Sequence, residues 1–141
     1  MSFMQAITSG FKRYVDFQGR SSRSEYWWWF LFSALINFAL GFIQGLIEAL
    51  SGGPNAASML FSILSTVATL ALFLPTIAVA VRRLHDTNRS GWWYLLVFTI
   101  IGIIPLLIWF CTRGTIGENR FGPDPLETDK PDSRPEGAWA T

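Results

Sequence analysis

The sequence predicts an all-α integral membrane protein with three transmembrane helices, an N-terminal amphipathic interfacial helix and a disordered C-terminal tail. Half of the 141 residues are apolar and only 15% are charged, whereas a soluble domain has about 25% charged residues. Three stretches near 20 residues carry no charge, which is the length of a membrane-crossing helix. We expect one membrane domain over residues 1–125 and a polar, proline-containing tail over 126–141.

The N-terminal segment has a helical pattern. Apolar residues at spacings of four, four and three form one stripe: Phe3, Ile7, Phe11 and Tyr14. We predict an amphipathic helix over residues 3–17 that lies on the membrane surface. The spacing fits equally well a short helix that packs on the protein itself.

The first uncharged stretch, residues 26–47, follows a helix-start signal. Ser22 and Glu25 have the three-residue spacing of a capping box. A helix over this stretch would extend about 33 Å, which matches the thickness of a bilayer core. The sequence Ser-Gly-Gly-Pro-Asn at residues 51–55 then predicts a tight turn.

Residues 58–81 and 91–111 form the second and third uncharged stretches, and both are predicted to span. Pro75 removes one helical hydrogen bond and is expected to kink the second span. Gly102 and Pro105 are expected to bend or break the third. If they turn the chain back, the third stretch is a re-entrant hairpin and not a span.

Arginine and lysine predict the orientation, because their translocation across a membrane is disfavoured. With three spans, the N-terminus and the connector 82–90 lie on one side and carry seven of these cations. The tail lies on the other side and carries four. The N-terminus and the connector are therefore expected in the cytoplasm, with the tail on the outer side.

The first two spans each carry a polar face. In the first span it consists of Asn37, Gly41, Gln44 and Glu48, and in the second of Ser62, Thr66, Thr69 and Thr76. Gly41 and Gly45 also form a small-xxx-small pair, which allows close helix approach. Unpaired polar groups are costly in hydrocarbon, so these faces should turn toward each other or toward a second copy. We interpret six residues as helix-packing positions: Asn37, Gly41, Gln44, Gly45, Thr66 and Thr69. The alternative is a polar pathway in an oligomeric transporter or channel subunit.

The connector and the start of the third stretch concentrate the polar chemistry, with Arg82, Arg83, His85, Asp86, Arg89, Trp92 and Trp93. If the second helix continues, Arg82, Asp86 and Arg89 share one face, and Asp86 would accept charge-assisted bonds from both arginines. One hypothesis is a salt-bridged structural clamp that also engages Glu25. A second, compatible hypothesis is that the arginines bind anionic lipid phosphates while the tryptophans lie at headgroup depth.

An interfacial enzyme that uses His85 and Asp86 is the third hypothesis. Adjacent helical residues point about 100° apart, which is a poor arrangement for an acid–base pair. The single Cys111 excludes a multi-cysteine zinc site. We therefore expect no catalytic residues, no metal and no cofactor. A net charge of +1 gives no reason to expect nucleic acid, and the expected partners are membrane lipids and a second copy or another membrane protein.

Several blocks occur in order along the chain: FQGR at 17–20, RSEYW at 23–27, RRLHDT at 82–87, RSGWW at 89–93, GT at 114–115 and GENRFGPDP at 117–125. Together they resemble the signature motifs of domain-of-unknown-function family 805, the YhaH-like small bacterial inner-membrane proteins. The resemblance covers about residues 11 to 126. It implies a helical protein of the bacterial inner (plasma) membrane. The three predicted spans would make such a protein multi-pass, with the predicted outer tail in the periplasm. The resemblance implies no activity and no catalytic residue.

Overall fold

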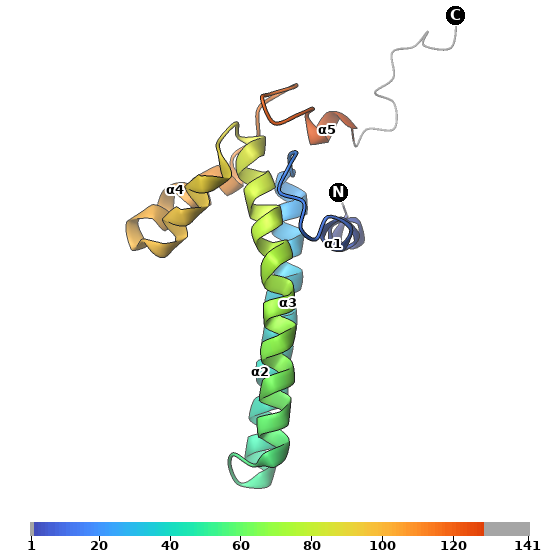
Figure 1. Ribbon diagram of the computed structural model, residues 1–141, viewed down its shortest axis with the longest axis vertical. Coiled ribbons are helices and arrows are strands. Elements are labelled where there is room, and N and C mark those ends of the chain that lie inside the picture. The colour runs from blue at the N-terminus through green and yellow to red at the C-terminus, as the bar shows by residue number, and fades with distance from the viewer. Residues whose placement is uncertain (1, 129–141) are drawn as a thin grey trace, which may run out of the picture.

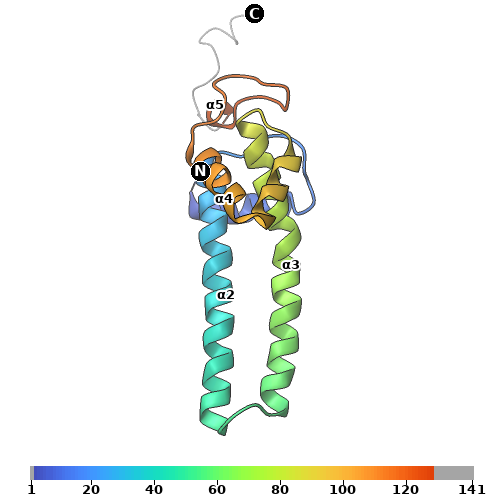
Figure 2. The ribbon, with the colours of Figure 1, turned by 90° about the vertical axis from the view of Figure 1, so that its left-hand side faces the viewer.

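Two long helices form an antiparallel hairpin that sets the long axis of the molecule (Figures 1 and 2). The computed structural model describes residues 2–128, and these helices are α2 (Arg23–Ser51) and α3 (Ala56–Asp86). The predicted turn joins them. Gly52 ends α2 in the left-handed region at φ 79°, where glycine has no side-chain penalty.

Both helices are long and apolar enough to cross a membrane by length and composition. Their 29 and 31 residues correspond to about 43 and 46 Å of helix. Large apolar side chains point away from the protein along most of their length, and Phe38 is 73% exposed. Exposure of this extent is unusual for a soluble protein and is expected of a surface that faces lipid. The all-helical, membrane-type prediction is confirmed at this level.

The break predicted in the third stretch, residues 91–111, is present, but it lies at Thr99 and not at Gly102 or Pro105. This stretch consists of the 3-10 helix η1 (Gly91–Phe98) and the helix α4 (Ile100–Cys111), which meet at an extended Thr99. The Thr99 hydroxyl caps α4 by accepting from the Gly102 backbone N–H at 3.0 Å. Twelve residues make about 18 Å of helix, which is too short for a bilayer core of about 30 Å. The chain turns back as a short hairpin at Thr99, and Gly102 and Pro105 lie inside α4.

The N-terminal helix α1 (Phe3–Lys12) is shorter than the predicted 3–17 and begins at a Ser2–Gln5 capping box. It crosses the hairpin axis and packs on α2 (Figure 1). The Phe3 ring centroid lies 5.6 Å from that of Trp28. Gly10 is buried, and a Cβ there would lie 2.2 Å from the Trp29 ring. The apolar stripe therefore contacts α2 directly.

The rest of the described chain gathers at the end of the hairpin opposite the turn (Figures 1 and 2). We call this end the cap: α1, the loop 13–22, the first two turns of α2 and residues 75–128, including the short helix α5 (Pro125–Thr128). The remainder of the hairpin is the shaft. The predicted disordered tail begins in α5, and its residues 129–141 lie outside the described part. Residues 112–128 contact the end of α3 and so lie beside the connector, whereas the sequence predicted that the tail and the connector lie on opposite sides of the membrane.

Candidate functional site

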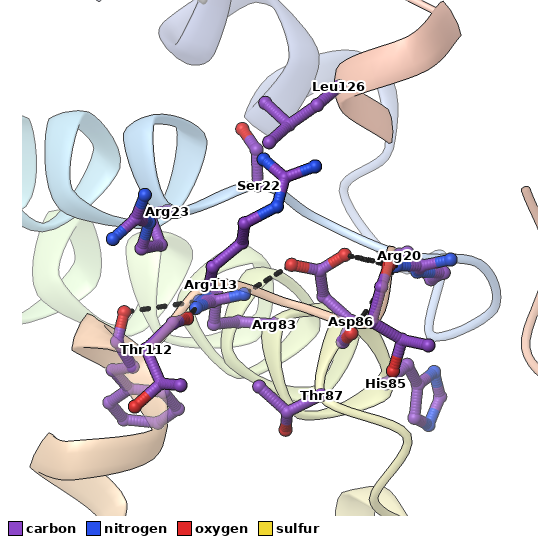
Figure 3. A network of polar contacts seen from close by, with 12 residues as sticks. Arg20, Ser22, Arg23, Arg83, His85, Asp86, Thr87, Thr112, Arg113 and Leu126 are labelled. Carbon is purple, nitrogen blue, oxygen red and sulfur yellow. Dashed lines mark hydrogen bonds and ion pairs between the residues drawn. The ribbon is translucent and has the colours of Figure 1, made fainter. Parts of the chain in front are cut away.

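A buried carboxylate, Asp86, lies at the centre of the cap (Figure 3). Arg20 reaches Asp86 Oδ1 from the loop before α2, with Nε at 3.0 Å and Nη2 at 2.9 Å. Arg83, one helical turn before Asp86, donates from Nη1 to Oδ2. Both guanidinium groups and the carboxylate are almost fully buried. Each oxygen of Asp86 thus receives its own charge-assisted bond, which is the condition for a tolerable buried ion pair.

The remaining nitrogens of Arg83 hold the end of α4. Its Nε donates to the Phe110 carbonyl at 3.2 Å, and Nη2 donates to the carbonyls of Trp109 at 3.1 Å and Thr112. Arg23 adds a bond to the Cys111 carbonyl at 3.2 Å. The last carbonyls of a helix have no intrahelical donors and carry partial negative charge. The two arginines therefore fix α4 to α2 and α3 through its C-terminus.

Arg20 organises the segment after α4 in the same way. Its Nη1 donates to the carbonyls of Gly117 at 2.6 Å and Gly122 at 3.2 Å, and Nη2 donates to the Thr115 carbonyl. The Asp86 backbone carbonyl accepts from the Thr115 N–H at 2.7 Å. A Cβ on Gly114 would lie 2.0 Å from Asp86 Oδ2, so the chain can pass the carboxylate only because residue 114 is glycine.

Arg13 holds the loop that delivers Arg20. Its Nε donates to Asp16 Oδ2 at 2.8 Å and its Nη2 donates to the Gln18 carbonyl at 2.7 Å. The hydrogen bond from Arg13 holds the pKa of the Asp16 carboxyl below its usual value. Gly19 then turns the chain at φ +85°, a conformation that favours glycine.

Arg82 forms a second buried pair, directed toward α1. Its guanidinium lies 3.6 Å from Glu25 Oε1, which also accepts from Ser9 Oγ at 2.8 Å. The Ser22 hydroxyl accepts from the Glu25 backbone N–H. Half of the predicted capping box is therefore present, because the Glu25 side chain turns to α1 and Arg82. This pair ties α1, α2 and α3 together, and the predicted engagement of Glu25 runs through Arg82.

The sequence predicted Arg82 and Arg89 as the partners of Asp86, and this prediction is wrong. Helix α3 ends at Asp86, so Arg89 leaves the helix and its guanidinium carbon lies 4.3 Å over the Trp109 ring. Arg82 and Arg83 are fully buried inside the cap. Neither can reach a lipid phosphate in this structure, which leaves Arg89 as the connector arginine closest to solvent or lipid.

His85 and the two connector tryptophans lie at the edge of the network. The His85 Nδ1 is 3.0 Å from the Gly19 carbonyl, and its ring stacks on Phe121 at 3.9 Å. Trp92 is 79% exposed, and Trp93 contacts Trp109 edge to face. Among the described residues, no group of three His, Cys, Asp or Glu side chains is arranged to hold a metal.

An apolar groove of about 840 Å³ lies between α3 and η1. Its walls are formed by Phe73, Ile77 and Val81 of α3 and by Leu95, Val97 and Phe98 of η1. At its cap end stand His85, Ser90 and Trp92. Gly91 lets η1 approach α3 closely at this end, because a Cβ there would lie 2.6 Å from Val81 Cγ1. The groove thus joins an apolar channel to a polar mouth.

The predicted packing positions lie together in the shaft, where a second cavity of about 310 Å³ separates α2 and α3. It is lined by Asn37, Gly41, Gln44, Ser62, Ser65, Thr66 and Thr69, which we call the polar seam. The Thr69 hydroxyl donates to Asn37 Oδ1 across the seam at 3.0 Å. The polar faces of the two helices do turn toward each other. Gly41 and Gly45, in contrast, have no atom within 4 Å of a built Cβ outside their own helix, so no neighbour in this chain uses their small size.

Several site residues were not found from the pattern of the connector. Arg20, Arg23, Gly114 and Phe121 come from other parts of the chain. All four lie in the sequence blocks quoted above, which is the signal that could have found them. No periodicity within the connector could have done so.

The chain is similar to proteins of known location. It is 46% identical over 123 residues to the inner membrane protein YhaI of Escherichia coli (strain K12), covering 86% of this chain and 96% of that protein. It is 44% identical over 115 residues to the inner membrane protein YhaH of the same organism, covering 81% and 90%. An uncharacterized protein, YiiR, is 28% identical over 135 residues. No solved structure matches. Because the model of the family described as "Protein of unknown function (DUF805)" matches residues 14–123, the chain belongs to this inner-membrane family, as its motifs predicted.

Proposed function

We propose that this protein is a non-enzymatic inner-membrane component that binds an anionic phospholipid, with one acyl chain in the groove between α3 and η1. The observation that carries the proposal is the shape of this groove. It follows α3 from His85 to Phe73, a distance of about 18 Å along a helix. Its volume of about 840 Å³ falls in the range of about 300–1,000 Å³ that is usual for ligand pockets.

The polar mouth supports an anionic headgroup. Ser90 lines the mouth, and Arg89 precedes it in the chain. Arg120 donates to the Asn88 carbonyl at 3.2 Å and covers the Phe121 ring, which in turn stacks on His85. No carboxylate is among the residues that line the groove. Neither arginine lines the groove, but each is connected to a residue at its mouth, and a phosphate bound there with its acyl chain in the groove would attract both.

The geometry of His85 and Asp86 supports the non-enzymatic part. Both Asp86 oxygens are bonded to arginines, and the His85 ring is sandwiched against Phe121 with Nδ1 at the Gly19 carbonyl. Asp86 therefore has no oxygen left to act as a general base or to orient His85, whose Nδ1 faces a backbone carbonyl instead of a carboxylate. Loss of a cellular phenotype on His85→Ala substitution, with the fold intact, would argue for the enzyme hypothesis instead.

We further propose that α2 and α3 span the membrane, with the cap in the cytoplasm and the 52–55 turn in the periplasm. Nine of the 11 Lys and Arg residues lie in the cap, the other two being Lys130 and Arg134, and the turn has none. Such asymmetry favours a cytoplasmic cap. On α1, Met4 and Phe11 remain 66% and 48% exposed, which suits a helix lying in the interface. Fused to the C-terminus, a reporter that works only in the cytoplasm should be active, and one that works only in the periplasm should be inactive. A periplasmic signal would contradict this topology.

Native mass spectrometry from mild detergent tests the lipid proposal. The Arg89→Gln, Arg120→Gln double variant should retain at least fivefold less phosphatidylglycerol than the wild type. Lys12→Gln is the single-charge control on α1, and it should retain wild-type amounts. Equal retention by the double variant and the wild type would refute the headgroup site.

The groove itself is tested by filling it. Leu95→Trp places a larger ring at a lining position and should displace bound lipid of any headgroup. Ile101→Trp, at an 82% exposed position outside the groove, is the matched control. If both tryptophan variants retain lipid equally, the acyl chain does not occupy the groove.

A further inference from the structure

We infer that the polar seam of the shaft is the contact surface for a second copy of this chain. The seam lies in the middle of the shaft, in the stretch of the hairpin that the proposed topology places in hydrocarbon. In the structure of residues 2–128, most seam residues are exposed: Asn37, Gly41, Ser62, Thr66 and Thr69. The inference is independent of the proposed lipid groove, which uses η1 and the other end of α3.

Hydrogen-bonding capacity in the seam exceeds what this chain satisfies. Asn37 donates from Nδ2 to its own-helix Ser33 carbonyl at 2.8 Å, and its Oδ1 accepts from Thr69. The second hydrogen on Nδ2 has no acceptor in the part of the chain that the structure describes. Gln44 Oε1 and Ser65 Oγ are also without hydrogen-bond partners there, but both atoms are buried, so a second copy reaches them only where the seam opens. Lipid tails offer no donors or acceptors, so these groups are costly where they are.

The polar groups of one seam can form hydrogen bonds with those of a second, identical seam. Side-chain amides and hydroxyls are donors and acceptors at once, so two identical seams related by a two-fold axis along the membrane normal are complementary. Both copies then keep the same orientation in the membrane. An anionic or cationic partner is not favoured, since none of the residues lining the seam is charged.

Two glycines of α2 leave space for close contact with another helix. Gly41 lines the seam, and Gly45 lies one turn further along α2. A Cβ at either position would meet nothing within 4 Å in this chain. Small residues at this spacing let the backbones of two membrane helices approach closely. A second copy on this face would use the space that α3 leaves empty.

Fluorescence energy transfer between copies tests the inference. Cys111 is the only cysteine and is exposed in the cap, so the full chain can be labelled there with donor or acceptor dyes. In vesicles of phosphatidylethanolamine and phosphatidylglycerol, the wild type should show saturable transfer above the level of random proximity. Gly41→Leu should reduce it to the random level, because the added side chain has room in the monomer but blocks close approach.

Ile43→Leu is the matched control. Ile43 lies two residues after Gly41, which is about 200° around the helix. Its side chain therefore points away from the seam, and this variant should keep wild-type transfer. Thr66→Leu, on the α3 side of the seam, is the second variant and should also abolish transfer. Random-level transfer in the wild type would overturn the inference, as would full transfer in both seam variants. Leu95→Trp should leave transfer unchanged, which separates this result from failure of the lipid proposal.

Discussion

The cap and the shaft of this protein are built on opposite principles. In the cap, the buried Arg20 and Arg83 are matched to Asp86 and to the carbonyls of α4 and of residues 115–122. In the shaft, α2 and α3 lie side by side with most side chains exposed, and the Asn37–Thr69 hydrogen bond crosses between them. Contacts within the chain therefore determine the structure of the cap, whereas the packing of the shaft depends on what surrounds it.

In the proposed topology, the difference follows from the solvent of each region. At the cap, water competes for every polar group, so a unique arrangement needs several mutually consistent charge-assisted bonds. In hydrocarbon, helices gain no hydrophobic free energy by associating, and small residues and a few hydrogen bonds decide their packing. Substitutions in the two regions should therefore differ strongly in size, and that expectation can be tested.

The largest effect is expected from Asp86→Ala. It removes the shared partner of Arg20 and Arg83 and leaves two buried cations uncompensated, which costs about 3–5 kcal/mol when a buried pair is broken. Denaturation in mixed micelles, followed by tryptophan fluorescence, should report this loss of stability. The control Asp16→Asn breaks a partly exposed pair with Arg13 and should cost less than about 1 kcal/mol. Similar losses for the two variants would show that the network does not hold the cap together.

A glycine-to-alanine pair compares the regions with one chemical change. Gly114→Ala forces a Cβ against Asp86 Oδ2 and the Asp86 backbone carbonyl, and overpacking of this kind costs about 1–3 kcal/mol. Gly41→Ala meets no atom in the chain and should be neutral or slightly stabilising in the monomer, because alanine favours the helix by up to about 1 kcal/mol. Thermal unfolding of the two variants in detergent measures the contrast. Equal melting temperatures would contradict the close approach at residue 114.

The sequence predicted the shaft better than the cap for a physical reason. Long uncharged runs and a Gly-Gly-Pro turn are local signals, and they were enough for α2, α3 and the connection between them. The third run had the same composition, but apolar length does not distinguish a span from a short hairpin, since lipid surrounds both. The break at Thr99 is marked only by one hydroxyl that caps α4 at Gly102.

The partners of Asp86 show the limit of periodicity. Helical spacing proposed Arg82 and Arg89, yet the structure uses Arg83 and an arginine 66 residues earlier in the chain, Arg20. Nothing local could choose among the arginines, because the choice depends on where the loop before α2 and the segment after α4 meet. The motif blocks contained both segments, but a motif does not state which of its residues touch.

The smallest loss of stability is expected in the shaft, from Thr69→Val. Valine keeps the shape of threonine but removes the hydroxyl that donates to Asn37 Oδ1. Interhelical bonds of this type in membranes contribute about 0.6 kcal/mol on average, with a maximum near 1.7, so the hairpin should lose little stability. A double-mutant cycle with Asn37→Ala, measured in dilute detergent where the protein is monomeric, isolates the coupling.

Thr66→Val is the control, because that hydroxyl donates to the Ser62 carbonyl of its own helix and should show no coupling to Asn37. A coupling as large as the Asp86→Ala loss would mean that the shaft, like the cap, is held by its internal polar contacts, and the contrast between the two regions would fail.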